Sequence, residues 1–209
     1  MRGTFITFEG SEGCGKSTQS RLLQAFLKRK GYKVIFLREP GVTALGEKIR
    51  KVLLDARNDS IVPECEMLLY MACRAQMVQQ IIKPALAKGT IVLCDRFLDS
   101  TFAYQGYGLG IDRALIKDLG KFVTQGITPD ITILLDVPIR KGLQYRDGVK
   151  DRIEQRAFAY HARVRRGYFT LARLEPGRIK VVKVAEDKLK TQEEIRRLVL
   201  SMVSGRHGA

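Results

Sequence analysis

The residues with the clearest capacity for chemistry lie near the start of the chain, in a loop rich in glycine. Residues 10–17 read GSEGCGKS and match the pattern GxxxxGK[ST]. Glycines let backbone N–H groups surround phosphate oxygens, and a following helix adds the positive end of its dipole. In such a loop Lys16 reaches the β- and γ-phosphates of ATP, and the hydroxyl of Ser17 ligates Mg²⁺. The residues expected to bind the nucleotide are Gly10, Ser11, Glu12, Gly13, Cys14, Gly15, Lys16, Ser17 and Thr18.

A second chemical pair follows an apolar segment in the middle of the chain. Asp95 ends that segment, where a carboxylate can face Mg²⁺ or its waters beside a phosphate loop. Arg96 follows at once, and its guanidinium matches a phosphate bidentately, so it could clamp the phosphate of a second substrate against ATP. A strand-end cap for Asp95 and a surface position for Arg96 are the alternatives.

Five apolar segments of strand length must position these side chains. Several are apolar at nearly every position and rich in Ile and Val, which is typical of strands buried on both faces of a parallel sheet. The segments are residues 4–9, 33–38, 90–95, 131–137 and 179–184. The glycine loop follows the first segment, and Arg96 follows the third.

Helical patterns fill the gaps between these segments. We expect helices over residues 16–30, 45–55, 64–88, 113–124, 152–174 and 192–203, with Pro84 kinking the third. This alternation predicts right-handed crossovers and an α/β fold. The expected architecture is a five-stranded parallel sheet flanked by helices, a three-layer sandwich like those of phosphate-loop NTPases. Residues 1–209 are expected to form a single domain.

The charge balance is strongly basic, at +15. A solvated basic surface, a nucleic-acid surface and a site for polyanionic small molecules all fit it. The motifs favour small phosphorylated ligands, and no repeated interleaving of basic and aromatic residues supports a nucleic-acid partner. No stretch approaches the ~18 apolar residues of a membrane span, and the first residues lack the pattern of a secretory signal. We therefore expect a cytoplasmic protein without a membrane partner.

The four cysteines form no CxxC pair, and the chain has only two histidines, which argues against a zinc site. Cys73 and Cys94 are expected in the core. Cys14 lies at the start of a helix, where a thiolate is stabilised, so alkylation of a reactive thiol is one hypothesis. A role as a small spacer residue is the favoured alternative.

The phosphate loop alone does not separate a kinase from a GTPase or an ATP-driven machine. The chain has no N/TKxD segment for reading guanine, and it is short for a nucleic-acid motor. The remaining class is a small kinase. Along nearly its whole length the chain resembles the thymidylate kinase family, of the bacterial type. The matching segments are residues 8–18 (FEGSEGCGKST), 38–41 (REPG), 68–76 (LLYMACRAQ), 95–106 (DRFLDSTFAYQG), 129–137 (PDITILLDV) and 151–155 (DRIEQ).

The resemblance implies transfer of the γ-phosphoryl group of ATP to dTMP, with Mg²⁺. It places Arg74 against thymine with Tyr70 stacked on the ring, and Arg96 on the dTMP phosphate. Tyr104 could crowd out a ribose 2′-hydroxyl, and Glu12 would lie near the deoxyribose 3′-hydroxyl. The implied substrate-binding residues are Arg38, Tyr70, Arg74, Arg96, Ser100, Thr101, Tyr104 and Gln105.

The bacterial type also supplies positive charge from a mobile lid, because its phosphate loop lacks an arginine. Here the lid would span about residues 144–152, with Arg146, Lys150 and Arg152 as the basic residues; a solvated helix end is as good a reading of Lys150. Lys16, Arg96, Glu12, Arg146 and Arg152 are the expected catalytic residues. The family is generally dimeric, so a homodimer is expected, with the helix from Glu64 as a possible interface.

Two departures from the family pattern stand out. Val42 occupies a position that is usually a second glycine, and the segment between Gly142 and Asp151 is shorter and poorer in arginine than in many relatives. Two alternatives to thymidylate phosphorylation stay open. One is a related kinase acting on another monophosphate or a deoxynucleoside, and the other is a basic ATP-binding protein that engages nucleic acid.

Overall fold

The computed structural model describes residues 2–145 and 151–207. Five parallel strands form one sheet in the order β2-β3-β1-β4-β5. All five strand predictions are confirmed to within one residue at each end, because the apolar runs are long enough to be unambiguous. The strands are β1 (Phe5–Glu9), β2 (Val34–Arg38), β3 (Ile91–Asp95), β4 (Ile131–Asp136) and β5 (Ile179–Lys183).

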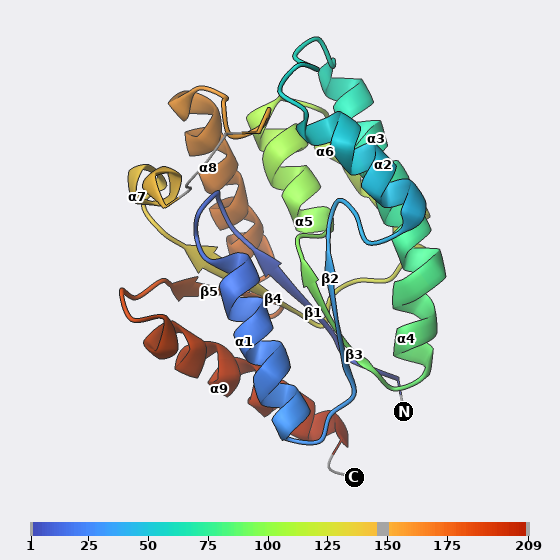
Figure 1. Cartoon of the computed structure of the whole chain (residues 1–209), viewed down its shortest axis with the longest axis vertical. Coiled ribbons are helices and arrows are strands. Elements are labelled where there is room, and N and C mark those ends of the chain that lie inside the picture. The colour runs from blue at the N-terminus through green and yellow to red at the C-terminus, as the bar shows by residue number, and fades with distance from the viewer. Residues whose placement is uncertain (1, 146–150, 208–209) are drawn as a thin grey trace.

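Helices cover both faces of the sheet and make three layers (Figure 1). On one face α1 (Lys16–Arg29) and α9 (Lys188–His207) pack Leu23, Leu27 and Val199 against Phe8 of β1. The opposite face is covered by the long helical segment that begins with α3 (Pro63–Met77). The layered parallel fold predicted from the alternation of elements is confirmed.

The long helix expected over residues 64–88 contains a change of helical type. It consists of α3, a π-helical turn η1 (Val78–Ile82) and α4 (Lys83–Ala87), with Pro84 just after the turn. A proline has no N–H to donate within a helix, and an inserted π turn is a usual place for a helix to change direction. Pro84 therefore lies directly after the change from π-helical to α-helical hydrogen bonding.

The remaining helices are α2 (Ala44–Leu54), α5 (Leu98–Thr101), the π-helical η2 (Phe102–Gly108), α6 (Arg113–Thr124), α7 (Ile139–Gln144) and α8 (Phe158–Leu174). The prediction that a helix starts at Arg152 was wrong, since α8 starts at Phe158. The side chain of Asp151 accepts hydrogen bonds from the amides of Ile153 and Glu154, both at 2.9 Å, and so holds a turn there. α5, η2 and α7 were not predicted.

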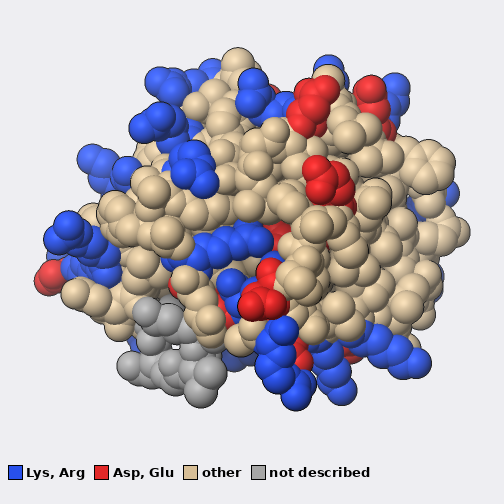
Figure 2. Space-filling model, turned by 90° about the horizontal axis from the view of Figure 1, so that it is seen from above, with Lys and Arg blue, Asp and Glu red and all other residues tan. Residues whose placement is uncertain are grey.

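The carboxyl ends of the strands converge at one edge of the sheet, which Figure 2 views from above. β1 lies between β3 and β4, so the loops after β1 and β3 leave side by side. Basic and acidic side chains gather in a hollow at this edge (Figure 2). Among the described helices, none has the length and apolar character needed to cross a membrane.

Candidate active site

The phosphate loop joins β1 to α1 and depends on glycine at positions where no other residue fits. Gly13 has φ +68°, and a Cβ built on it would lie 1.8 Å from the carbonyl oxygen of Gly142. Gly10 has φ +138°, and its Cβ would lie 2.4 Å from the carbonyl oxygen of Leu135. The loop is thus packed closely against the backbone of residues 135 and 142, and α1 begins at its end, at Lys16. The loop thus has the geometry of a phosphate cradle.

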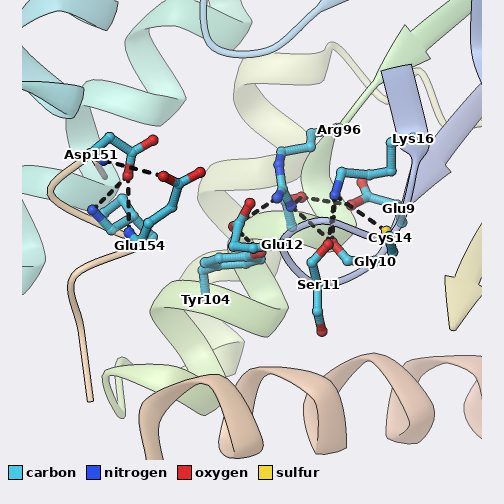
Figure 3. A network of polar contacts seen from close by, with 12 residues as sticks. Glu9, Gly10, Ser11, Glu12, Cys14, Lys16, Arg96, Tyr104, Asp151 and Glu154 are labelled. Atoms are coloured by element: carbon cyan, nitrogen blue, oxygen red, sulfur yellow. Dashed lines mark hydrogen bonds and ion pairs between the residues drawn. The ribbon is translucent and has the colours of Figure 1, made fainter. Parts of the chain in front are cut away.

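Lys16 folds back over the loop that contains it. Its Nζ donates to the carbonyl oxygens of Gly10 at 2.9 Å and Ser11 at 2.8 Å (Figure 3). The side chain is buried but lines a large cleft. The ammonium group is therefore held where phosphate oxygens in the loop would meet it.

Ser17 and Asp95 meet across the two central strands. The Ser17 hydroxyl donates to Oδ2 of Asp95 at 2.6 Å, although the residues are 78 positions apart. A hydroxyl and a carboxylate are hard oxygen ligands of the type Mg²⁺ takes beside nucleotide phosphates. Among the described residues, no group of three or more His, Cys, Asp or Glu side chains could hold a metal. The pair therefore suits a cation whose other ligands are phosphate oxygens and water.

Arg96 occupies a left-handed turn directly after β3, with φ 72°. Its guanidinium points back over the phosphate loop, donating to the carbonyl oxygen of Gly10 at 3.2 Å and to Glu12 at 2.8 Å (Figure 3). It also lies over the ring of Tyr104, 4.8 Å from the centroid. Several contacts thus fix the direction of the guanidinium.

Glu12 links the loop to the far wall of the cleft. Tyr104 donates its hydroxyl proton to Oε1 of Glu12 at 2.6 Å. Burial by itself would raise the pKa of Glu12, but the positive charges of Arg96 and Lys16 outweigh it and lower that pKa to about 2. The carboxylate is therefore ionised at neutral pH and available as a hydrogen-bond acceptor.

Arg74 reaches the cleft from α3 and is almost completely buried, at 1 % exposed. Its guanidinium forms an ion pair with Glu39, and Nη2 donates to Thr101 at 2.9 Å and to the carbonyl oxygen of Phe97 at 3.1 Å. Glu39 belongs to the REPG segment after β2. Arg74 thus connects the loops after β2 and β3, and the side chains of Tyr70 and Gln105 line the same cleft.

One cleft of about 480 Å³ brings most of the predicted site residues together, a size suited to nucleotide-sized ligands. Two predicted residues, Gly10 and Ser11, support it through the carbonyl oxygens that hold Lys16. Arg146 and Lys150 lie outside the described residues. The predicted residues that line the cleft are Glu12, Gly13, Cys14, Gly15, Lys16, Ser17, Thr18, Arg38, Tyr70, Arg74, Asp95, Arg96, Ser100, Thr101, Tyr104 and Gln105.

Arg152 requires a correction, because it is directed away from the expected position. Its side chain is buried; Nη2 donates to Glu66 at 2.6 Å and Nε donates to the carbonyl oxygen of Leu53 at 2.9 Å. A neighbour, Arg156, donates to the same Glu66 at 2.6 Å. The long-range attraction of the buried carboxylate explains the orientation, and it was invisible in the local sequence.

The hypothesis of a reactive Cys14 is also opposed by the structure. The thiol is 1 % exposed, and burial raises its pKa even though Lys16 Nζ lies 3.5 Å from the sulfur. A buried thiol with a raised pKa reacts slowly. The reading of Cys14 as a small spacer residue fits better, since its Sγ packs 2.8 Å from where a Cβ on Gly10 would stand.

The loop around Val42 keeps a conformation that favours glycine. Val42 has φ 61°, in the left-handed region, and its amide donates to Oε1 of Glu47 at 2.7 Å. Glu47 also pairs with Arg38 at 3.2 Å, which holds the segment against α2. Val42 therefore adopts a conformation that glycine would take without strain.

Sequence reasoning missed several residues of the cleft, including Glu39, Arg50 and Glu154. Glu39 and Glu154 lie within motifs that had been recognised, REPG and DRIEQ, so the motifs themselves were a usable signal. Arg50 lies on α2 and donates to the carbonyl oxygen of Pro40 at 2.8 Å. Nothing in its local sequence distinguishes it from other basic residues on the same helix.

A parallel sheet of this order, with a phosphate loop after β1 and a carboxylate at the end of β3, defines a phosphate-loop nucleotide-binding protein. Comparison with known proteins narrows that class. The family model for thymidylate kinase matches residues 8–195. The chain belongs to the thymidylate kinase family, and it is an enzyme of that family.

Individual relatives agree with this assignment. The thymidylate kinase of Trichlorobacter lovleyi is 47% identical over 208 residues, covering 96% of this chain and 98% of the relative. That of an Exiguobacterium species is 51% identical over 181 residues, covering 86% of this chain and 85% of the relative. A crystal structure of thymidylate kinase from Ehrlichia chaffeensis superposes with a TM-score of 0.81 at 36% identity, over 95% of this chain and 100% of that chain.

Proposed function

We propose that this enzyme transfers the γ-phosphoryl group of ATP to dTMP, giving dTDP and ADP, a step in the synthesis of dTTP. The observation that carries the proposal is that two positively charged side chains share one hydrogen-bond acceptor. Lys16 Nζ and Arg96 Nη1 both donate to the carbonyl oxygen of Gly10, at 2.9 and 3.2 Å. One cation belongs to the ATP cradle and the other to the acceptor side. This shared contact supports the proposal, because it would hold the two phosphates next to each other, as an in-line transfer requires.

The chemistry requires charge neutralisation rather than a general base. The acceptor is itself a phosphate anion with a second pKa of about 6, so its oxygen attacks without losing a proton to the protein. Lys16 and Arg96 would offset the negative charge that builds up between donor and acceptor. The cleft therefore has no need of a histidine near the reacting atoms.

Ser17 and Asp95 would hold Mg²⁺, directly or through its waters. When bound there, Mg²⁺ would supply positive charge that neutralises part of the charge of the ATP phosphates. The 2.6 Å contact between the two side chains supports this assignment, because one ion at this point would face both.

The acceptor side of the cleft supports a pyrimidine deoxynucleotide. We assign the thymine to Arg74, Tyr70, Thr101 and Gln105, which line the cleft from α3, α5 and η2. Burial raises the pKa of Tyr70, so its ring stays neutral and suited to stacking. The deoxyribose would lie near Tyr104 and Glu12, whose 2.6 Å hydrogen bond closes the space that a 2′-hydroxyl would need.

We further propose a homodimer that works in the cytoplasm, with a lid about residues 144–152 that supplies Arg146 and Lys150. Apolar side chains on α3 and α6 support the dimer, since Leu68 is 53% exposed and Phe122 80% exposed. Sedimentation of the purified chain at micromolar concentration should give a mass of twice the chain's. A monomer at these concentrations would contradict the dimer.

A panel of acceptors tests the function. Purified enzyme with ATP and Mg²⁺ is given dTMP, dUMP, CMP, AMP or thymidine, and the products are separated by anion-exchange chromatography. We expect dTDP to form fastest. Faster phosphorylation of CMP, AMP or thymidine would assign the enzyme to a related kinase. DNA binding that weakens steeply with salt, together with no dTDP, would instead favour the nucleic-acid alternative.

A further inference from the structure

Glu9 is a fully buried carboxylate for which the proposed reaction has no direct use. It is the last residue of β1 and directly precedes the phosphate loop. The amide of Phe97 donates to Oε1 at 2.7 Å. The hydroxyls of Ser100 and Tyr168 donate to Oε2 at 2.6 and 2.8 Å. Three elements thus meet at one carboxylate: the turn after β3, α5 and α8.

The same two hydroxyls also contact Arg96. Its Nη1 donates to Ser100 Oγ at 3.3 Å and to the Tyr168 hydroxyl oxygen at 3.2 Å. An ionised carboxylate can only accept hydrogen bonds, so a hydroxyl that bonds to it turns its proton toward Glu9, and the two hydroxyl oxygens also lie 2.8 Å from each other. The lone pairs of the hydroxyls are then left for the guanidinium. Glu9 therefore determines which way the hydroxyl groups around Arg96 are oriented.

Glu9 also holds the backbone of the turn. Arg96 has φ 72°, a conformation that residues other than glycine rarely adopt. The amide bound by Glu9 belongs to Phe97, the next residue. A strained position of this kind persists only where its surroundings hold it, and such positions gather at functional sites.

We propose that Glu9 is a positioning residue, which holds the turn and the guanidinium of Arg96 in the arrangement that receives the acceptor phosphate. This inference rests on the proposed function, in which Arg96 binds that phosphate. Glu9 touches neither substrate in this scheme. It acts on the acceptor phosphate through Ser100, Tyr168 and the Phe97 amide.

The electrostatics of Glu9 support a role other than stability. Burial, and then the negative charge of Asp99 on α5, raise the pKa of Glu9 to about 7, against the lowering effect of Ser100, Arg96 and Tyr168. A carboxyl whose pKa is raised on folding stabilises the fold at low pH, and this contribution is lost as the pH rises through 7. Above pH 7 the enzyme therefore keeps an ionised Glu9 at a cost in stability.

A double-mutant cycle tests the inference. Glu9→Gln keeps the size of the side chain but replaces one acceptor oxygen by a donor, so it cannot accept from all three partners. We expect kcat with dTMP to fall about 10- to 100-fold while KM for ATP stays within about twofold, since misplacing a binding group costs on this order. In an Arg96→Ala background, adding Glu9→Gln should change kcat by less than about twofold, because its target is gone.

The outcomes separate this inference from the proposed function. A wild-type enzyme that phosphorylates none of the acceptors overturns the proposed function and the inference with it. Normal wild-type turnover with multiplicative effects of the two substitutions overturns the inference alone, as does a Glu9→Gln enzyme with wild-type kcat.

Thermal melts give a second readout, which does not depend on activity. Between pH 5.5 and 8.5 the midpoint of Glu9→Gln should fall less than that of the wild type, because glutamine has no charge to bury. Glu66→Gln, at another fully buried carboxylate that accepts several hydrogen bonds, is the matched control and should be less stable than the wild type at both pH values. A Glu9→Gln chain that is as destabilised as this control at pH 8.5 would mark Glu9 as structural and overturn the inference.

Discussion

Two glutamates of this enzyme are both completely buried, yet they have opposite surroundings. Glu9 is surrounded by two hydroxyls and a backbone amide, with Asp99 nearby. Glu66, on α3, accepts from the guanidinium groups of Arg152 and Arg156, both at 2.6 Å, and from Gln105 at 2.8 Å. In the described part of the chain, the donors to Glu9 are two hydroxyls and one backbone amide, all of them neutral. Glu66, in contrast, accepts from two positively charged guanidinium groups.

The difference shows how one residue type serves two purposes. A buried carboxylate paired with guanidinium groups ties segments together, and removing it leaves buried positive charge behind. A buried carboxylate held by neutral donors is ionised only at some cost, and it orients the groups around it. We therefore infer that Glu66 stabilises the segment 151–156 and that Glu9 orients the side chain of Arg96.

The largest loss of activity should come from replacing Arg96, the residue that Glu9 orients. Arg96→Ala removes a guanidinium from the point where we propose that the two phosphates meet, so kcat should fall by about 10²–10³ with little change in melting temperature. Lys16→Ala is the matched variant on the ATP side, and its kcat should fall by a similar factor. Initial rates and circular-dichroism melts measure both. A near-normal rate in either purified variant would remove that residue from the mechanism.

Glu66→Ala should lower the stability of the fold rather than the rate of the reaction. It leaves Arg152 and Arg156 without their carboxylate, and the free energy of unfolding should fall by about 3–5 kcal/mol. Urea unfolding followed by far-UV circular dichroism measures the change. A loss below 1 kcal/mol would show that water enters and solvates the two guanidinium groups, and the contrast with Glu9 would then disappear.

Tyr168→Phe sharpens the comparison at the Glu9 cluster by deleting one bridging hydroxyl. Its oxygen contacts both Glu9 at 2.8 Å and Arg96 at 3.2 Å. Loss of a hydrogen bond to a charged group is worth about 1.5 kcal/mol, so kcat should fall about tenfold. Steady-state rates with dTMP test this. An unchanged kcat would mean that Glu9 orients Arg96 through the Phe97 amide and not through the Tyr168 hydroxyl.

Arg156→Ala is the corresponding deletion at the Glu66 cluster and should have the smallest effect. Its side chain is 19% exposed, and Arg152 remains to pair with Glu66. The free energy of unfolding should fall by about 1 kcal/mol, with kcat within about twofold of the wild type. If kcat fell as far as in Tyr168→Phe, the two clusters would no longer be functionally distinct.

The sequence by itself determined the sheet and the phosphate end of the cleft. The five apolar runs could be read as strands because period and length act locally, and the glycine loop carries its own geometry over residues 10–17. Asp95 and Arg96 were identified because parallel strands end at one edge, so a polar pair after a buried strand must lie there. The segments 38–41, 68–76 and 95–106 supplied the acceptor side by resemblance.

Only the tertiary structure decided what the buried charges do. Glu9 and Tyr168 are 159 residues apart, and Glu66 and Arg152 are 86 apart. Nothing in either local segment indicates the partner, so Arg152 was expected at the phosphates and Glu9 was not considered at all. Local patterns determine whether a residue lies in a strand or a helix, because backbone hydrogen bonds and side-chain periodicity act over a few residues. The partner of a buried charge depends on which elements pack together, because only the folded chain removes the water that would otherwise solvate it.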